Sequence, residues 1–306
     1  MARVAGYELE ALVGKGGMDE VYRAVIRAGA RAGSPVAVKL LRPDLAEDPE
    51  FLELFRAEAE VTRRMHHPAI VEVIEAGIDA GAPYLVMEYV DGRNLRQILA
   101  QCAARAILLP LDFGAYAAHV LAGALDHAHA GVDEAGRPLG IVHCDLSPSN
   151  VFVSRLGEIK LGDFGVALAA GDARGRGSGA MGKIHYLAPE QLRGGPITPR
   201  TDLFALGCVL FELLTEQRAF PGATVEEVGR RILEGRLRAP SEVRPEVPFE
   251  LDLITLRCLA ADPAERWPSA AAFAAEIATR YDPAIGTPLA IAAVVRGLFG
   301  SREAGR

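Results

Sequence analysis

The stretch GIVHCDLSPSNVFV, residues 140–153, places a group of polar side chains between two apolar ends. Within it Asp145 precedes Asn150 by five positions, and Asp163 follows further along in the tetrapeptide GDFG. Amide and carboxylate oxygens are ligands that Mg²⁺ accepts, and a carboxylate can also take the proton of an attacking hydroxyl. The pattern is therefore typical of phosphoryl transfer, with Asp145 as base and with Asn150 and Asp163 as metal ligands.

Residues upstream of this stretch indicate the same chemistry. The segment VGKGGMDEVY, residues 13–22, lies between two predicted strands, and its glycines would let backbone N–H groups approach phosphate oxygens. Taken alone, the segment is explained equally well by a structural hairpin turn. Lys39 lies in the apolar strand VAVKLL and needs a partner there, because burial of an unpaired ammonium is costly. Glu58 on the following helix is the expected partner, and a lysine that reaches solvent by its own length is the alternative.

The rest of the pattern predicts a small sheet followed by a mainly helical region. Strands are expected at 7–14, 20–29, 34–41, 69–78 and 82–90, with a helix from Pro49 that Asp48 caps. Beyond residue 94 the periodicity is helical, apart from a strand-and-loop segment at 140–168. Residues 201–216, TDLFALGCVLFELLTE, are apolar nearly all round and predict a buried helix.

Charge and cysteine content exclude several classes of function. A formal net charge of −7 with no basic stripe argues against a nucleic-acid partner. The four cysteines show no C-x-x-C spacing, so neither a disulfide framework nor a zinc site is expected, which fits a cytoplasmic location. The first residues lack a signal-peptide pattern. The apolar segment at 288–300 is too short to span a membrane and predicts a packing helix.

In this order the motifs resemble the eukaryotic-type (Hanks-type) protein kinase family, and within it bacterial serine/threonine protein kinases. The resemblance covers about residues 7–281 and includes the Gly-rich turn, the strand lysine, the catalytic loop, the DFG sequence and the APE sequence. It implies an α+β, two-lobed fold. A small antiparallel β-sheet lobe would occupy residues 7–90 and a larger, mainly α-helical lobe residues 91–281, followed by a short helical tail at 282–306.

The resemblance also implies a role for each motif residue. Lys39 would hold the α- and β-phosphates of ATP, Glu58 would orient Lys39, and Asp145 would be the catalytic base. Asn150 and Asp163 would bind Mg²⁺, for which Mn²⁺ can substitute. The implied nucleotide-binding residues are Val13, Gly14, Lys15, Gly16, Gly17, Met18, Asp19, Glu20, Val21, Ala37 and Lys39, with Glu88 and Val90 at the hinge.

Further residues are implied to support the site. His143 and Phe164 would stack in a spine that rests on Asp202. Glu190, in the APE sequence, would form a structural ion pair with Arg266.

Four positions depart from the family pattern. Asp19 replaces a glycine, Cys144 replaces the Arg before the base, Ser147 replaces a Lys, and Lys183 replaces a Thr. Without the Arg at position 144, a phosphate on the activation loop would have little ordering effect. The hydroxyls between Asp163 and Glu190 are those of Ser178 and Tyr186. We therefore predict that phosphorylation of this loop does not switch the enzyme.

Two of these departures concern the transferred phosphate directly. The family's Lys at position 147 donates to the γ-phosphate, and loss of one such donor costs about 10²–10³ in rate. By resemblance Lys183 lies beside Asp145 and could restore the donor, which makes it a candidate catalytic residue. A solvated surface lysine is the alternative. Asp19 brings a carboxylate near the triphosphate and would weaken nucleotide binding unless it turns outward.

The expected activity is transfer of the γ-phosphate of Mg–ATP to a Ser or Thr hydroxyl of a protein partner. Pro148 fits the serine/threonine branch of the family better than the tyrosine branch. Two alternatives stay open. One is a pseudokinase that binds nucleotide or a partner without efficient transfer. The other is a small-molecule kinase of the aminoglycoside or choline type, although that class lacks the Gly-rich turn and the APE segment. The sequence specifies neither the substrate nor the oligomeric state.

Overall fold

A computed structural model describes residues 3–46, 48–164, 180–281 and 286–303. These residues form two compact units. The first includes residues up to 67 together with 71–89, and the second includes 68–70, 90–164 and the described residues from 180 onward. The first unit is built on a sheet and the second is mainly helical, which confirms the α+β fold class predicted from the sequence.

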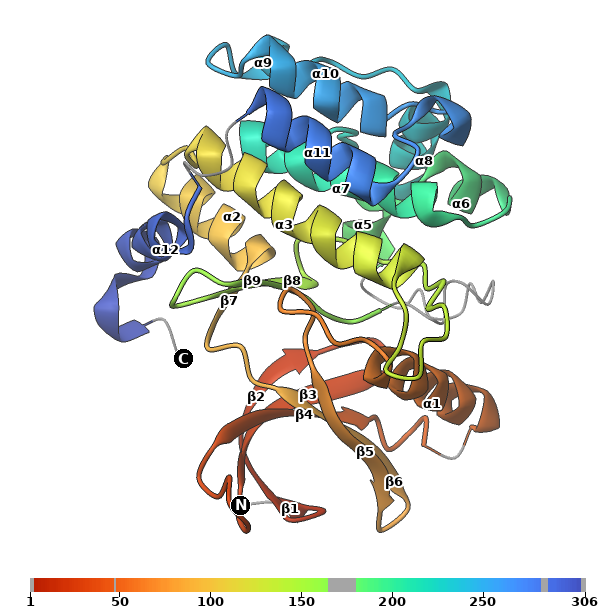
Figure 1. The fold of residues 1–306 in the computed structure, drawn as a ribbon, viewed down its shortest axis with the longest axis vertical. Coiled ribbons are helices and arrows are strands. Elements are labelled where there is room, and N and C mark those ends of the chain that lie inside the picture. Colours follow the sequence, from red (N-terminus) through yellow and green to blue (C-terminus); the bar gives the residue numbers. More distant parts are fainter. Residues whose placement is uncertain (1–2, 47, 165–179, 282–285, 304–306) are drawn as a thin grey trace. The chain divides into compact units, whose positions relative to one another are not determined.

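The first unit consists of one six-stranded antiparallel sheet and one helix (Figure 1). In chain order its elements are β1 (Arg3–Val4), β2 (Tyr7–Lys15), β3 (Asp19–Ile26), β4 (Pro35–Leu41), α1 (Pro49–Arg63), β5 (Val73–Asp79) and β6 (Ala82–Glu88). The strand order is β1-β2-β3-β4-β6-β5. Strands β4 and β6 are thus central neighbours, which places Lys39 opposite Leu85 and Val21.

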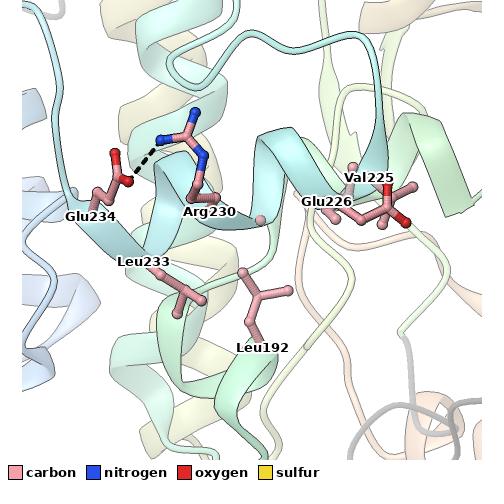
Figure 2. A pocket seen from close by; sticks show the side chains of 8 residues that line it. Leu192, Val225, Glu226, Arg230, Leu233 and Glu234 are labelled. Carbon is pink, nitrogen blue, oxygen red and sulfur yellow. Dashed lines mark hydrogen bonds and ion pairs between the residues drawn. The ribbon is translucent and has the colours of Figure 1, made fainter.

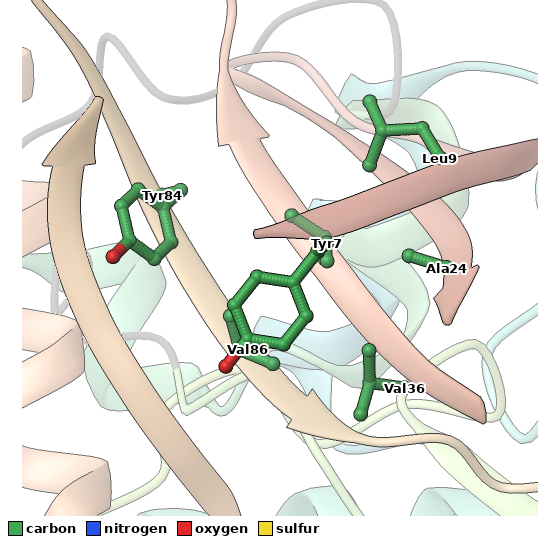
Figure 3. Close-up of a cluster of buried hydrophobic side chains, with 7 residues drawn as sticks. Tyr7, Leu9, Ala24, Val36, Tyr84 and Val86 are labelled. Atoms are coloured by element: carbon green, nitrogen blue, oxygen red, sulfur yellow. The ribbon is translucent and has the colours of Figure 1, made fainter. Parts of the chain in front are cut away.

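One face of this sheet carries a buried apolar cluster (Figure 3). Its members lie at alternate positions of the strands β2, β3, β4 and β6, as strand geometry requires. They are Tyr7, Leu9, Ala24, Val36, Val38, Tyr84 and Val86. The hydroxyls of Tyr7 and Tyr84 both donate to the Glu75 carboxylate, at 2.7 and 2.5 Å. Because the tyrosines satisfy their polar ends in this way, they can contribute their rings to the core.

Helix α1 begins where the sequence predicts. Asp48 is the N-cap, its carboxylate accepts the backbone N–H of Glu50 at 2.9 Å, and Pro49 occupies the first turn. Phe55, Ala59 and Thr62 are the buried residues of the helix. The cap and the apolar face fix the rotation of α1, and with it the direction of Glu58.

The second unit consists of a small three-stranded sheet and a set of helices (Figure 1). Its first elements are β7 (Gly92–Asn94), α2 (Leu95–Arg105), α3 (Leu111–Ala130), β8 (Val151–Ser154) and β9 (Ile159–Leu161). After the residues left undescribed come α5 (Ala180–Lys183), a 3₁₀ turn (Ile184–Tyr186), α6 (Pro189–Arg193), α7 (Pro199–Thr215), α8 (Val225–Glu234), α9 (Pro240–Val243), α10 (Phe249–Cys258), a 3₁₀ turn (Pro263–Glu265), α11 (Ala270–Arg280) and α12 (Pro288–Glu303).

Helix α7 is the centre of the second unit. All of its residues from Thr201 to Thr215 are buried, which confirms the prediction made from their apolar character. Helix α3 packs against both α7 and α11 (Figure 1). A helix buried on every side is a fixed support, so groups attached to α7 can hold loops in place.

The tail helix α12 packs on α2. Its buried residues are Ile291, Ala292, Val295 and Leu298. Gln101 and Arg105 of α2 donate side-chain hydrogen bonds to the carbonyls of Leu298 and Gly297, both at 3.1 Å. The segment is thus the packing helix predicted from the sequence. None of the described helices combines the length and apolar character that a bilayer crossing requires.

Three features of the secondary structure differ from the sequence prediction. The strand predicted at 69–78 begins only at Val73, because Ala69 and Ile70 pair instead with Leu161 of β9. The strands β1 and β7 were not predicted, since two or three residues are too few to show a period. Strand β7 ends at Asn94, which caps α2 in a reciprocal pair of hydrogen bonds with Gln97.

Candidate active site

Lys39 and Glu58 form the ion pair that the sequence predicts. The Lys39 side chain is only 5% exposed, and its Nζ lies 2.7 Å from Glu58 Oε1. Strand β4 supplies the lysine and α1 supplies the carboxylate. The alternative of a lysine that reaches solvent on its own is therefore wrong.

The Gly-rich segment is the turn between β2 and β3 with its flanking residues. The backbone N–H of Gly16 donates to the carbonyl of Asp19 at 2.8 Å and closes the turn. A Cβ on Gly16 would lie 2.6 Å from Asp19 Oδ1, so a larger residue here would force the Asp19 carboxylate to move. Val13, Gly14 and Lys15 end β2, whereas Asp19, Glu20 and Val21 begin β3, with Gly17 and Met18 between them.

The remaining predicted nucleotide-binding residues lie in or next to the central strands. Ala37 is buried in β4 opposite Met87 of β6. Glu88 ends β6, and its backbone N–H donates to the carbonyl of Glu72 at 2.9 Å. Val90 follows two residues later, in the second unit.

Asp19 turns inward rather than outward. Its Oδ2 lies 3.4 Å from Lys39 Nζ, and its side chain is 17% exposed. Lys39 therefore has two carboxylates close to its ammonium, those of Glu58 and Asp19. Asp19 directly follows the Gly-rich turn, where the sequence predicts phosphate.

The loop that contains Asp145 is anchored on Asp202 of α7. Asp202 Oδ2 accepts the backbone N–H of His143 at 2.7 Å, and its Oδ1 accepts that of Cys144 at 2.8 Å. His129 Nε2 lies 2.7 Å from the same carboxylate. Cys144 has a positive φ of 65°, which is strained for a residue with a side chain, and these hydrogen bonds hold it there. Burial raises the pKa of the Cys144 thiol to about 12, which makes it an unreactive core group.

The predicted stack on this anchor is present. The rings of His143 and Phe164 have centroids 4.5 Å apart, and His143 Nε2 lies 3.1 Å from the carbonyl of Gly162. His143 thus links the loop of Asp145 to the residues on either side of Asp163.

Asn150 is fixed between Asp145 and the strand pair that precedes Asp163. Its Nδ2 donates to the carbonyl of Asp145 at 2.9 Å and to Asp145 Oδ2 at 3.1 Å. The backbone N–H of Gly162 donates to the carbonyl of Asn150 at 2.9 Å, and β8 pairs with β9 between these two residues. Because its amide nitrogen is used in this way, Asn150 has its Oδ1 left as a metal ligand.

The side-chain oxygens of Asn150 and Asp163 suit a magnesium ion that nucleotide phosphates also bind. Mg²⁺ is often held by only one or two protein oxygens together with substrate phosphates. Within the described ranges, no group of three or more His, Cys, Asp or Glu side chains could hold a metal ion by itself. The Asn150 and Asp163 pair therefore suits a metal that arrives with phosphate ligands.

Lys183 lies beside Asp145, as the resemblance implied. Its Nζ is 2.5 Å from Asp145 Oδ2, although 51% of the Lys183 side chain is exposed. Ser147 is buried, and its Oγ has no hydrogen-bond partner among the residues that the structure describes. Lys183 is thus half exposed and at the same time paired with the candidate base, and its part in catalysis stays a prediction.

The structural ion pair predicted for the APE segment is also present. Arg266 Nη1 and Nη2 donate to the two oxygens of Glu190 at 2.7 and 2.8 Å, and both residues are buried. Burial is the largest single influence and would raise the pKa of Glu190. The hydrogen bonds from Arg266, the backbone and Thr201, together with the charge of Arg266, outweigh it and hold the pKa below its usual value.

A buried polar cluster near this site was not predicted. Glu212 of α7 accepts hydrogen bonds from Tyr186 and, at 3.2 Å each, from Arg96 and Arg218. Burial raises the pKa of Glu212 to about 7 despite the nearby Arg96. Glu212 is a second carboxylate, after Asp202, in a mostly apolar helix, and it was the sequence signal that could have indicated this cluster.

The second unit also carries a surface hollow of about 480 Å³ (Figure 2). It is lined by Ile184, Leu192, Val225, Glu226, Gly229, Arg230, Leu233 and Glu234. An ion pair of 2.7 Å joins Arg230 to Glu234 at its rim. None of the predicted catalytic, nucleotide-binding or metal-binding residues lines this hollow.

The structure thus brings the predicted residues together in two sets. Lys39, Glu58 and Asp19 meet in the first unit, whereas Asp145, Asn150 and Lys183 meet in the second, next to the residues flanking Asp163. Ser178 lies outside the described residues.

Comparison with known proteins shows the family to which the chain belongs. The family model of the protein kinase domain matches residues 7–277. The tyrosine-protein kinase MasK of Myxococcus xanthus is 35% identical over 300 residues, which cover 97% of this chain and 46% of MasK. The probable serine/threonine-protein kinase SCO3848 of Streptomyces coelicolor is 38% identical over 307 residues, which cover 96% of this chain and 43% of that protein.

A solved structure shares the fold. The crystal structure of the Mycobacterium tuberculosis PknI kinase domain aligns with a TM-score of 0.66 and 29% identity, covering 91% of this chain and 97% of that one. The chain spans less than half the length of MasK and of SCO3848. On the match over residues 7–277 and these relatives, the chain belongs to the protein kinase family and has its two-lobed fold.

Proposed function

We propose that this chain transfers the γ-phosphate of Mg–ATP to a Ser or Thr hydroxyl of a protein. The observation that carries the proposal is the pattern of hydrogen bonds at the Asp145 carboxylate. Asn150 and Lys183 both bind its Oδ2. The remaining oxygen, Oδ1, is then the atom that accepts the proton of the attacking hydroxyl.

The residues of the first unit serve the nucleotide. Lys39, oriented by Glu58, binds the α- and β-phosphates, and the turn of Gly14, Gly16 and Gly17 supplies backbone N–H groups. Val13, Val21 and Ala37 contact the adenine. The carbonyl of Glu88 and the N–H of Val90 bind the edge of the base. The 2.7 Å contact between Lys39 and Glu58 supports the first of these roles.

Asn150 and Asp163 hold Mg²⁺, or Mn²⁺ in its place, through side-chain oxygens. When bound, the metal ion neutralises charge on the phosphates and helps to orient them. The hydrogen bonds that fix Asn150 support its part in this pair.

Lys183 serves the transferred phosphate. The family's lysine at position 147 is a serine here, and Ser147 is too short to reach beyond its buried position. The ammonium of Lys183 is already bound to the base, so a small movement of an exposed side chain would bring it to the γ-phosphate. A donor placed before the reaction stabilises the charge that develops on the phosphate.

The acceptor is a Ser or Thr side chain of a protein partner in the cytoplasm. Pro148 and the likeness to SCO3848 support this choice, whereas MasK is named a tyrosine kinase. The acceptor class therefore has to be measured together with the activity.

The direct test is transfer of labelled phosphate from ATP and Mg²⁺, to the chain itself and to a general protein acceptor. We expect label on Ser or Thr after acid hydrolysis, and its loss in Asp145→Asn. Asp126→Asn is a matched control, because Asp126 accepts the backbone N–H of Ala271 at 3.1 Å and is not among the predicted site residues. Nucleotide binding without transfer would contradict the proposal, as would label on Tyr alone or on small hydroxylated acceptors alone.

A further inference from the structure

The position of Asp19 follows from the register of the sheet. Val21 of β3 lies opposite Lys39 of β4, and Asp19 lies opposite Leu41. Residues two apart on a strand share a face, so Asp19 and Lys39 are diagonal neighbours on one face of the sheet. A diagonal pair is within reach of a long side chain, and the observed Nζ–Oδ2 distance is 3.4 Å.

The glycine of the turn leaves room for the same carboxylate. A Cβ on Gly16 would lie 2.6 Å from Asp19 Oδ1, so a side chain there would push the carboxylate away. The backbone N–H of Gly16 donates to the backbone carbonyl of Asp19 at 2.8 Å, which fixes the backbone of Asp19 at this point. The carboxylate therefore lies beside both the turn and the ammonium of Lys39, and both are groups that the proposed function assigns to phosphate.

We infer that Asp19 is an internal anion that competes with nucleotide phosphate for Lys39, and that it makes the chain select metal-bound over metal-free nucleotide. Phosphates that approach Lys39 must either displace Asp19 or lie beside it. A divalent cation removes most of the charge that Asp19 repels, so the cost of its presence is largest for the free nucleotide. This inference rests on the proposed function only in taking Lys39 as the phosphate-binding lysine.

The strand geometry provides a clean variant. Asp19 is part of β3 and pairs with Leu41, so Asn fits its backbone and keeps its shape while removing the charge. Asp79→Asn is the matched control. It removes one charge from the same sheet at the far end of β5, where Asp79 accepts the backbone N–H of Ala5 at 2.7 Å.

The test is calorimetric binding of ADP to the full chain, once with Mg²⁺ and once with a chelator. We expect Asp19→Asn to bind metal-free ADP about tenfold more tightly than the unsubstituted chain, the size of one like-charge contact. Binding of Mg–ADP should tighten only about twofold to threefold, because less charge remains to be repelled. Asp79→Asn should leave both affinities within about twofold. Asp79 pairs with Ala82 at the start of β6, whereas Lys39 pairs with Leu85, and salt screens a charge that is separated from the nucleotide site.

Three outcomes would overturn the inference. If Asp19→Asn binds both forms as the unsubstituted chain does, Asp19 does not compete, although the proposed function stands. Weaker binding in Asp19→Asn would mean that the carboxylate positions Lys39 instead. If no variant binds nucleotide, the proposed function fails with it. Thermal unfolding of each variant, together with Asp19→Ser as a second substitution, shows whether any loss comes from misfolding.

Discussion

Lys39 and Lys183 each hold a carboxylate, at 2.7 and 2.5 Å, but the surroundings of the two ammonium groups differ sharply. Lys39 is 5% exposed, comes from the middle of a central strand and has Asp19 as a further neighbour. Lys183 is 51% exposed and ends the short helix α5. The first lysine is fixed by the sheet, whereas the second is free to move its side chain without breaking any core contact.

This difference separates two kinds of contribution to a reaction. A buried ammonium needs its carboxylates, so Lys39 and Glu58 are one unit whose geometry is set when the chain folds. Lys183 is half exposed, whereas its partner Asp145 is only 9% exposed, so water competes mainly for the ammonium and the pair adds less to stability than a fully buried one. A role of Lys183 in the transfer itself belongs to the proposed function.

The largest expected effect belongs to the buried lysine. Lys39→Ala and Lys39→Arg should both lower the rate of phosphate transfer by about 10³-fold, because the first removes the donor and the second does not fit its buried site. Initial rates of labelled transfer at high Mg–ATP measure this. Should Lys39→Arg keep more than about a tenth of the rate, the site would not be as rigid as its burial indicates.

The buried ion pair of Glu190 and Arg266 extends the comparison to a pair with a structural role alone. Glu190→Gln should lower the free energy of unfolding by about 3–5 kcal/mol, because it leaves the buried Arg266 without its countercharge. Glu234→Gln is the control, since its partner Arg230 is exposed and the change should cost less than about 1 kcal/mol. Denaturant unfolding measures both, and equal costs would contradict the role given to burial.

The same pair predicts the response to acid. The pKa of Glu190 is lowered on folding, so its contribution to stability is present above the ordinary pKa of a glutamate. That contribution is lost as the pH falls through the lowered value. The pH profile of unfolding should therefore lose this acid-dependent part in Glu190→Gln and retain it in Glu234→Gln.

A smaller effect is expected from a conservative change at the exposed lysine. Lys183→Arg should keep the transfer rate within about tenfold, because an exposed side chain can adjust a larger cation to the same oxygen. Lys39→Arg, measured alongside, gives the contrast directly. If both arginine variants lose activity equally, the difference in burial has no functional meaning.

The smallest effect is expected from Ser178→Ala. Position 144 is a buried Cys rather than an Arg, so no cation stands there to receive a phosphate on the loop. The transfer rate should change by less than about twofold. A collapse of activity in this variant, measured by the same assay, would show that phosphorylation of Ser178 does order the site.

Features with a strong local signal could be predicted from the sequence. The apolar character of residues 201–216 predicted α7, and Asp48 with Pro49 predicted the start of α1. The cost of burying an unpaired ammonium in an apolar strand predicted the pair Lys39–Glu58, whereas the pair Glu190–Arg266 came from family resemblance.

Features that depend on tertiary contacts could not be predicted. Whether Asp19 turns inward depends on which residue of β4 it faces, and a register is not visible in a single strand. The partners of Glu212 come from α2, from the 3₁₀ turn and from beyond α7, so only the folded chain brings them together. The short strand β7 exists because β8 pairs with it.

The most direct test of the account is a mutant cycle between positions 147 and 183, read as the single-turnover rate of phosphate transfer. Lys183→Ala should lower that rate about 10²-fold, the usual cost of one preorganised donor. Adding Ser147→Lys to Lys183→Ala should restore most of it, because the second change returns an ammonium to the same phosphate. If Lys183→Ala turns over as fast as the unsubstituted chain, the ammonium beside Asp145 has no part in the transfer, and the account of this altered loop is wrong.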